Sequence, residues 1–175
     1  VFGIWYGKGP GVDRAGDALK HVNLAGTSKF GGVIALMGDD HICESSTTSH
    51  QSEFAMIDAM IPFFNPSGVQ EILDYGIIGI ELSRKSGCWV GIKCVHDNVS
   101  SGATVDLDEN RLNLLDISSE TYPSEGLNIR LKDTAQEKEY RLHHHKIKYV
   151  KEFCKLNSLN LSLIHISEPT RRTDI

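Results

Sequence analysis

The first stretch whose residue types suit ligand chemistry is the glycine-rich run Gly7-Lys8-Gly9-Pro10-Gly11. It follows an apolar, aromatic run over residues 2–6 and precedes a predicted helix over residues 14–24. Glycines in such a loop let a ligand approach the main chain, and the amino-terminal end of a helix favours anions. The spacing matches neither a Walker loop nor a G-x-G-x-x-G dinucleotide loop. On spacing alone, a tight structural turn and a ligand-binding loop are equally good interpretations.

Two adjacent carboxylates and a histidine, Asp39-Asp40-His41, follow the continuous apolar run of residues 33–37. Continuous apolarity is typical of a parallel strand that is covered on both faces. The carboxyl ends of such strands line the ligand crevice of open α/β sheets. Paired carboxylates beside an imidazole suit metal binding or acid–base catalysis. They are also typical of residues that only cap the next segment and fix its loop.

Three further groups of polar residues are candidates. Residues 45–51 offer hydroxyl and amide groups for hydrogen bonds to a polar ligand, or they form an ordinary polar loop. Lys20, His21 and Asn23 end the predicted first helix near the expected crevice, although cations there also complement the helix dipole. The histidine run 143–145 lies on a predicted helix, where consecutive side chains diverge, so a shared metal is not expected.

Strand and helix signals alternate through residues 1–97, and the predicted elements would position these groups. The predicted strands are residues 2–6, 33–37, 61–64 and 88–95, and the predicted helices are residues 14–24, 54–60 and 69–84. Gly87 marks the end of the last helix. Gly76 and Gly79 each cost about 1 kcal/mol relative to Ala inside that helix, which close packing on a sheet would compensate. The alternation predicts an α/β layered domain with a parallel sheet.

The pattern weakens after residue 100. Residues 103–108 alternate as a surface strand, residues 116–138 are polar with weak periodicity, and residues 142–156 predict a last helix. We interpret residues 101–160 as a connection to the following region. The tail, residues 161–175, begins with a run that matches one translated frame of a sequencing-library adapter, so we leave it out of the fold.

Composition and charge exclude several classes of function. The chain has 175 residues and a formal net charge of −5, which gives no basic field for nucleic acid or an anionic membrane. Its apolar runs are far shorter than the roughly 20 residues of a membrane span. Residues 1–6 lack the basic region and cleavage site of a signal peptide and open directly as a strand. We therefore expect a cytoplasmic protein whose chain begins inside a domain.

The cysteines do not indicate a metal centre. They are Cys43, Cys88, Cys94 and Cys154, and no two have C-x-x-C spacing. Zinc and iron–sulfur sites use that spacing, so neither is expected within this chain. Without a secretory signal, free thiols are the expected state.

Ordered motifs cover nearly all of the chain before residue 160. They are residues 5–17 (WYGKGPGVDRAGD), 20–27 (KHVNLAGT), 38–41 (GDDH), 45–47 (SST), 50–53 (HQSE), 65–71 (NPSGVQE) and 86–91 (SGCWVG), with a weaker run at 126–130 (GLNIR). Together these motifs resemble the fused bacterial indolepyruvate:ferredoxin oxidoreductases, which are thiamine-diphosphate-dependent 2-oxoacid oxidoreductases.

The resemblance implies a fold and a reaction. The fold is a three-layer parallel-sheet α/β domain of the thiamine-diphosphate-binding type within residues 1–100, incomplete at its N-terminus. The reaction is oxidative decarboxylation of indolepyruvate or a related aryl 2-oxoacid to the acyl-CoA, with coenzyme A and ferredoxin as partners. Thiamine diphosphate acts as the electron sink, and iron–sulfur clusters remove the electrons singly. In this family the domain receives the aminopyrimidine, while other domains of a dimeric enzyme hold the diphosphate, Mg²⁺ and clusters.

The resemblance also selects residues for the cofactor or substrate crevice. They are Gly9, Pro10, Gly11, Lys20, His21 and Asn23, with Asp39, Asp40, Ser45, Ser46 and Gln51 approaching from the neighbouring strand end. No individual catalytic role follows for any of them.

Three departures from the family pattern limit what this chain does alone. The glutamate that protonates the aminopyrimidine would lie before Val1, and neither the Gly-Asp-Gly motif for metal and diphosphate nor the cluster cysteines occur here. We therefore expect the isolated chain to be inactive. A relative that acts on pyruvate or branched-chain oxoacids is the nearest alternative. The alternative from another class is a noncatalytic interaction module with a decayed fold of this type.

Overall fold

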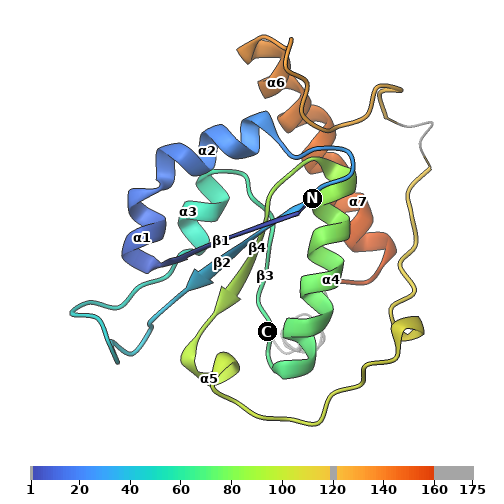
Figure 1. Ribbon diagram of the computed structural model, residues 1–175. Coiled ribbons are helices and arrows are strands. Elements are labelled where there is room, and N and C mark those ends of the chain that lie inside the picture. The colour runs from blue at the N-terminus through green and yellow to red at the C-terminus, as the bar shows by residue number, and fades with distance from the viewer. Residues whose placement is uncertain (1, 119–121, 160–175) are drawn as a thin grey trace, which may run out of the picture.

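A parallel four-stranded sheet forms the middle layer of the protein, with strand order β1-β2-β4-β3 (Figure 1). The computed structural model describes residues 2–118 and 122–159. The strands are β1 (Gly3–Lys8), β2 (Val33–Gly38), β3 (Phe63–Phe64) and β4 (Val90–Cys94). The predicted α/β class with a parallel sheet is therefore confirmed.

Helices cover the two faces of the sheet (Figure 1). Those on one side are α1 (Gly9–Arg14), α2 (Gly16–Ala25) and α3 (Glu53–Asp58), and α4 (Val69–Ser86) packs on the other side. Val12, Leu19 and Met56 surround Met37 on the first face. On the second face, Ile78 and Leu82 of α4 pack on Ile34, Val90 and Ile92. Each fully buried side chain of this size contributes about 1.5–3 kcal/mol, so these two clusters hold the layers together.

The two glycines inside α4 differ in their surroundings. A Cβ on Gly79 would lie 2.7 Å from Ile34 Cδ1, so this glycine lets the helix pack closely on the sheet, as predicted. A Cβ on Gly76 would meet no atom within 4 Å in the described part of the chain, so sheet packing does not explain it. Gly87 ends α4 in the left-handed conformation with φ of 72°, which confirms the predicted stop.

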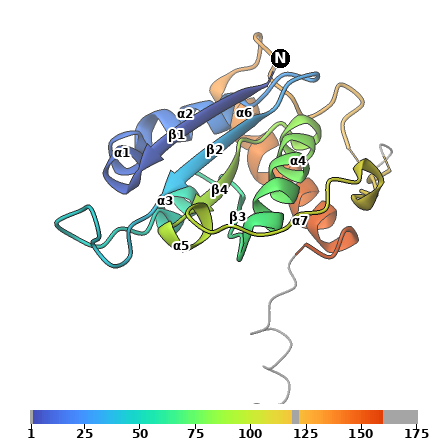
Figure 2. The ribbon, with the colours of Figure 1, turned by 60° about the horizontal axis from the view of Figure 1, so that its bottom comes forward.

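A C-terminal helical arm packs against α4. It comprises α6 (Ala135–Arg141), a π-helical turn (Leu142–Lys146) and α7 (Ile147–Leu156). Thr134 and Glu137 form a capping box that starts the arm several residues before the predicted helix. Val150 and Phe153 of α7 join the core cluster between α4 and the sheet, and Figure 2 shows α7 beside α4. The segment predicted to be a connection thus contributes to the same core as the sheet.

The remaining connections are short or irregular. They include α5 (His96–Val99) and a 3₁₀ turn at Glu109–Arg111. The surface strand predicted over residues 103–108 is wrong, because the structure has no regular element there. The adapter-like tail lies outside the described residues. Among the described helices, none has both the length and the apolar character that a membrane span requires.

Candidate functional site

The carboxyl ends of β1, β2 and β4 bring charged side chains together at one edge of the sheet. We call this the carboxyl edge and define it by Lys8, Asp39, Asp40, Glu53 and Lys93. Lys8 Nζ lies 2.6 Å from Ser45 Oγ and 3.5 Å from Asp40 Oδ2. The amide of Asp39 donates to the main-chain oxygen of Cys94 at 2.8 Å, which joins the ends of β2 and β4. The predicted placement of the two aspartates at the end of a buried strand is confirmed.

Asp40 anchors the loop that follows β2. Its carboxylate accepts hydrogen bonds from the amides of Glu44 at 2.8 Å and Ser45 at 3.0 Å. Its main-chain oxygen accepts from the amide of His50 at 3.1 Å, which closes the loop. The Ser45 amide has the largest effect on the pKa of Asp40 and lowers it to about 2 despite partial burial. Asp40 is therefore ionised at neutral pH and holds the loop.

Asp39 and Glu53 have partners within the chain as well. Asp39 is buried and accepts hydrogen bonds from the Ser52 amide at 2.9 Å and the Ser52 hydroxyl at 2.5 Å. Glu53, the first residue of α3, forms an ion pair with the buried Lys93 of β4. Burial of Glu53 raises its pKa, but the Lys93 hydrogen bond and charge outweigh burial and leave the pKa below its ordinary value. The ionised form of Glu53 is thus stabilised.

One group at this edge has the composition of a metal site. Ligand atoms of Asp39, His41 and Glu53 lie within 4.8 Å of one another. Carboxylate and imidazole ligands of this kind suit a divalent transition metal. However, Ser52 already donates to Asp39, and the Lys93 ammonium already compensates the charge of Glu53. Asp39 and Glu53 Oε1 therefore have partners within the chain, whereas Glu53 Oε2 is buried without a hydrogen-bond partner among the described residues.

The glycine-rich run is not a loop, and that prediction is wrong. β1 continues to Lys8 and α1 begins at Gly9, with Pro10 in the first turn, where its fixed φ suits a helix and its missing N–H costs nothing. A Cβ on Gly9 would lie 2.5 Å from Cβ and Cγ of His50, so Gly9 allows His50 to approach α1. A Cβ on Gly11 would meet no atom within 4 Å among the described residues, so Gly11 stays open to an approaching molecule.

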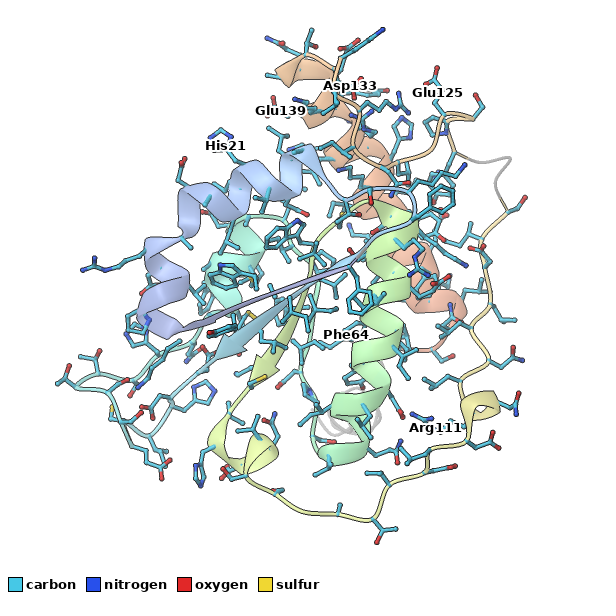
Figure 3. All side chains as sticks on the ribbon, viewed as in Figure 1. His21, Phe64, Arg111, Glu125, Asp133 and Glu139 are labelled. Carbon is cyan, nitrogen blue, oxygen red and sulfur yellow. The ribbon has the colours of Figure 1, made fainter. Side chains whose placement is uncertain are left out.

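The residues predicted on α2 do not join the carboxyl edge. Lys20 forms an ion pair with Asp58 of α3 at 2.6 Å. His21 lies on the outer side of α2, as Figure 3 shows, 3.6 Å from Asp17. Asn23 is fully buried at the opposite edge, where its Oδ1 accepts from the amide of Trp89 at 3.0 Å, just before β4 begins.

The topology of the fold explains why Asn23 lies away from the carboxyl edge. A helix that connects two parallel strands runs antiparallel to them, so α2 carries its last turn back to the amino-terminal ends of the strands. The Asn23 amide nitrogen donates to the main-chain oxygens of Ala59 at 3.0 Å and Met60 at 2.8 Å. The expectation that Asn23 lies near the crevice is therefore wrong, and its side chain joins three segments of backbone.

The loop of residues 41–52 carries the other predicted residues. Ser45 and Gln51 are exposed and Ser46 is half-buried, so all three belong to the surface beside the carboxyl edge. Sequence reasoning missed Glu53 and Lys93. The signal was a single lysine inside the apolar run 88–95, because a cation in a buried strand requires a partner carboxylate.

The loop after β2 and α3 contribute negative charge only, apart from histidine. Residues 39–58 contain five carboxylates and neither Lys nor Arg, and only cations from other segments, such as Lys8 and Lys93, offset them.

Comparisons with protein-family models, curated proteins and solved structures found no match for this chain. The motifs and the geometry of the carboxyl edge are therefore the observations that bear on function.

Proposed function

We propose that this chain is part of a thiamine-diphosphate-dependent oxidoreductase that converts indolepyruvate or a related aryl 2-oxoacid to its acyl-CoA, with ferredoxin as electron acceptor. In this proposal the carboxyl edge forms the wall that receives the aminopyrimidine. Other parts of a dimeric enzyme supply the diphosphate site, Mg²⁺ and the iron–sulfur clusters.

One observation carries the proposal. The motif around Gly9-Pro10-Gly11 is about 30 positions before Asp39-Asp40 and residues 45–51, yet these segments meet at the carboxyl ends of a parallel sheet. Ligands of open α/β sheets bind at these strand ends. These three of the motifs that carry the resemblance thus lie at the strand ends where ligands of open α/β sheets bind, whereas Lys20, His21 and Asn23 do not.

The charge of this wall suits one half of thiamine diphosphate. The loop and the start of α3 carry Asp39, Asp40, Glu44 and Glu53 and neither Lys nor Arg, so this part of the wall would repel a diphosphate. The same acceptors suit the N–H groups of an aminopyrimidine and a cationic ring. Gly11, which has open space at its Cα, and the exposed Ser45 would contact the bound cofactor. When bound, the cofactor supplies the electron sink for decarboxylation.

A second candidate rests on the internal bonding of the same residues. Asp39 and Asp40 have their carboxylate oxygens engaged by Ser52, Glu44 and Ser45, as in a loop whose function is structural. That bonding favours a noncatalytic interaction module with a thiamine-type fold.

Expression of the complete gene that contains this sequence tests the two candidates. Under anaerobic conditions with coenzyme A, the whole protein should reduce methyl viologen when indolepyruvate is added. Pyruvate and 2-oxoisovalerate serve as comparison substrates and identify a relative with another specificity. The 175-residue chain alone should give no reduction. Absence of activity with all three substrates, in a protein loaded with thiamine diphosphate and clusters, would favour the noncatalytic module.

A further inference from the structure

Three residues with metal-ligating side chains lie together at the carboxyl edge. One ligand atom each of Asp39, His41 and Glu53 lies within 4.8 Å of the other two. In the described part of the chain, no other group of three or more His, Cys, Asp or Glu residues comes this close. Asp39 and His41 follow β2, and Glu53 begins α3. The fold therefore brings two carboxylates and an imidazole together from two neighbouring elements.

Hydrogen bonds within the loop after β2 fix two of these ligands. The amide of His50 donates to the main-chain oxygen of Asp40 at 3.1 Å, which brings the chain back to the end of β2. The amide of Ser52 donates to Asp39 Oδ2 at 2.9 Å, so the next residue, Glu53, starts its helix beside Asp39. Partners of this kind orient the ligands of metal sites in proteins. The two carboxylates are therefore held together by the loop itself.

The second carboxylate oxygen of Glu53 is an independent sign of a bound ligand. Oε2 is buried and accepts no hydrogen bond from the described residues. The other buried side-chain atoms without a partner in the described part of the chain are the Nε atoms of Arg111, Arg130 and Arg141, whose terminal guanidinium nitrogens all form ion pairs. Glu53 Oε2 is thus the one acceptor among them. A buried carboxylate oxygen without a partner is costly, and a bound ion or water usually accounts for it.

The cation already present leaves one negative charge without compensation. The ammonium of Lys93 pairs with Oε1 of Glu53, so it does not occupy Oε2. Asp39 is only 6% exposed, and its oxygens accept hydrogen bonds from Ser52, which is neutral. None of the ion pairs among the described residues includes Asp39. Because buried carboxylates are usually paired with a cation or bound to a metal, the position between Asp39 and Glu53 Oε2 favours a further cation.

The imidazole of His41 selects the kind of cation. Mg²⁺ and Ca²⁺ take oxygen ligands, whereas imidazole together with carboxylates suits a divalent transition metal. Bonds from such an ion to nitrogen and oxygen are about 2.1 Å long, so its ligand atoms lie about 3–4 Å apart. His41 is exposed, and rotation of its side chain can close the remaining gap while Asp39 and Glu53 keep their places.

We propose that Asp39, His41 and Glu53 bind a divalent transition-metal ion of the Zn²⁺ type through one atom each, with Oε2 as the ligand atom of Glu53. Three protein ligands leave coordination positions for water, as in catalytic zinc sites and unlike closed structural ones. This ion is additional to the Mg²⁺ of the proposed function, which other parts of the enzyme hold. Its binding is measured without oxoacid, coenzyme A or ferredoxin, so the result is independent of the proposed reaction.

Titration of the untagged 175-residue chain with Co²⁺ tests this inference. Co²⁺ accepts the same ligands as Zn²⁺, and its visible absorption reports coordination by the protein. The chain is first treated with EDTA, which is then removed. A single equivalent of Co²⁺ should bind saturably, and Zn²⁺ should displace it. Mg²⁺ and Ca²⁺ should bind at least about 10-fold more weakly, because one of the three ligands is an imidazole. A thiolate-to-metal charge-transfer band would instead place the ion on a cysteine and contradict the proposal.

Variants locate the ion. His41→Ala and Glu53→Gln should each weaken Co²⁺ binding at least about 10-fold, because each removes a ligand. His143→Ala is the matched control, because His143 is exposed in the histidine run of the helical arm and its loss should leave the affinity unchanged. An equal loss in His143→Ala would assign the ion to the histidine run and overturn the proposal. Unchanged affinity in His41→Ala, or no Co²⁺ binding to the parent chain, would also overturn it and leave water as the partner of Glu53 Oε2.

A stability measurement separates metal binding from folding. Zn²⁺ at 100-fold its Kd should raise the Tm of the parent chain by roughly 5–10 °C, because the ion binds the folded state. Without metal, His41→Ala should have the Tm of the parent within about 2 °C, because His41 is exposed. The same variant should lose most of the rise that Zn²⁺ causes. A full rise in His41→Ala, or a metal-free Tm lowered as much as the rise is reduced, would show that His41 is not a ligand.

Discussion

The ammonium of Lys146 donates a hydrogen bond of 3.3 Å to the main-chain oxygen of Gly87. It donates a second one, also 3.3 Å, to the main-chain oxygen of Asn23. Gly87 caps α4 and Asn23 lies in the last turn of α2, so one cation meets the carboxyl-terminal ends of two helices, where the dipoles favour it. Lys146 is fully buried, and it ties the helical arm to helices from both faces of the sheet.

Lys146 should make the protein more stable at alkaline pH. Burial has the largest effect on its pKa and lowers it from 10.5 to about 8. Between these two values the unfolded chain binds more protons than the folded chain, so the free energy of unfolding rises with pH. The shift corresponds to at most about 3 kcal/mol, present above pH 10.5 and lost as pH falls through 8. Urea unfolding at pH 7.5, 9 and 10 measures this rise.

Other groups titrate in the same range, so variants must isolate the contribution of Lys146. Cys88, Arg141 and Asp133 also influence its charge. Lys146→Met should remove most of the rise in unfolding free energy, whereas Lys151→Met, at an exposed position on α7, should keep it. Identical slopes for the two variants would show that Lys146 keeps an ordinary pKa in the folded protein.

A methyl group should be tolerated very differently at the two glycines of the first turn of α1. Gly9→Ala forces its Cβ to within 2.5 Å of His50, and overpacking of this kind typically costs about 1–3 kcal/mol. Gly11→Ala meets no neighbour in the described residues and should stabilise the chain by up to about 1 kcal/mol. Denaturant unfolding of both variants measures the difference. Equal stability would mean that His50 does not pack on α1 in solution.

Asp40 should stabilise the protein above about pH 4 and lose this effect in acid. Its pKa falls from 3.8 to about 2, first because the Ser45 amide donates to it. A carboxylate with a depressed folded-state pKa contributes stability that disappears as pH drops through that pKa. Asp40→Asn should therefore flatten the decline in unfolding free energy between pH 4 and pH 2. Asp17→Asn serves as control, because the Asp17 side chain is 94% exposed and should leave the profile unchanged.

The sequence predicted the layers well because local signals determine them. Continuous apolar runs became β2 and β4, and Gly87 ended α4 in the left-handed conformation that only glycine adopts easily. The start of the helical arm was missed because the signal was a polar capping box at Thr134, placed before any apolar repeat. The glycine-rich run was assigned to a loop because glycine and proline are common in turns, although proline also suits the first turn of a helix.

The candidate site was predictable only in part. Asp39 and Asp40 follow a buried strand, so their place at the carboxyl edge follows from the topology of parallel sheets. The partnership of Glu53 with Lys93 joins residues 40 positions apart, and no local pattern specifies which carboxylate meets a buried lysine. Family motifs grouped Lys20 with the same site, yet its side chain meets Asp58 on the outer layer. Motif membership therefore did not distinguish residues of the edge from residues of the scaffold.

A variant of Asn23 tests whether this motif residue belongs to the scaffold or is available to a ligand. Its side chain is fully buried, accepts from the Trp89 amide and donates to the main-chain oxygens of Ala59 and Met60. Asn23→Ala leaves these buried groups without partners, and each unsatisfied group costs about 1–3 kcal/mol. We therefore expect a loss of at least about 2 kcal/mol in the free energy of unfolding. His21→Ala, on the exposed side of the same helix, should change it by less than about 0.5 kcal/mol. If Asn23→Ala were as stable as His21→Ala, Asn23 would be free to serve a ligand, and its assignment to the scaffold would be wrong.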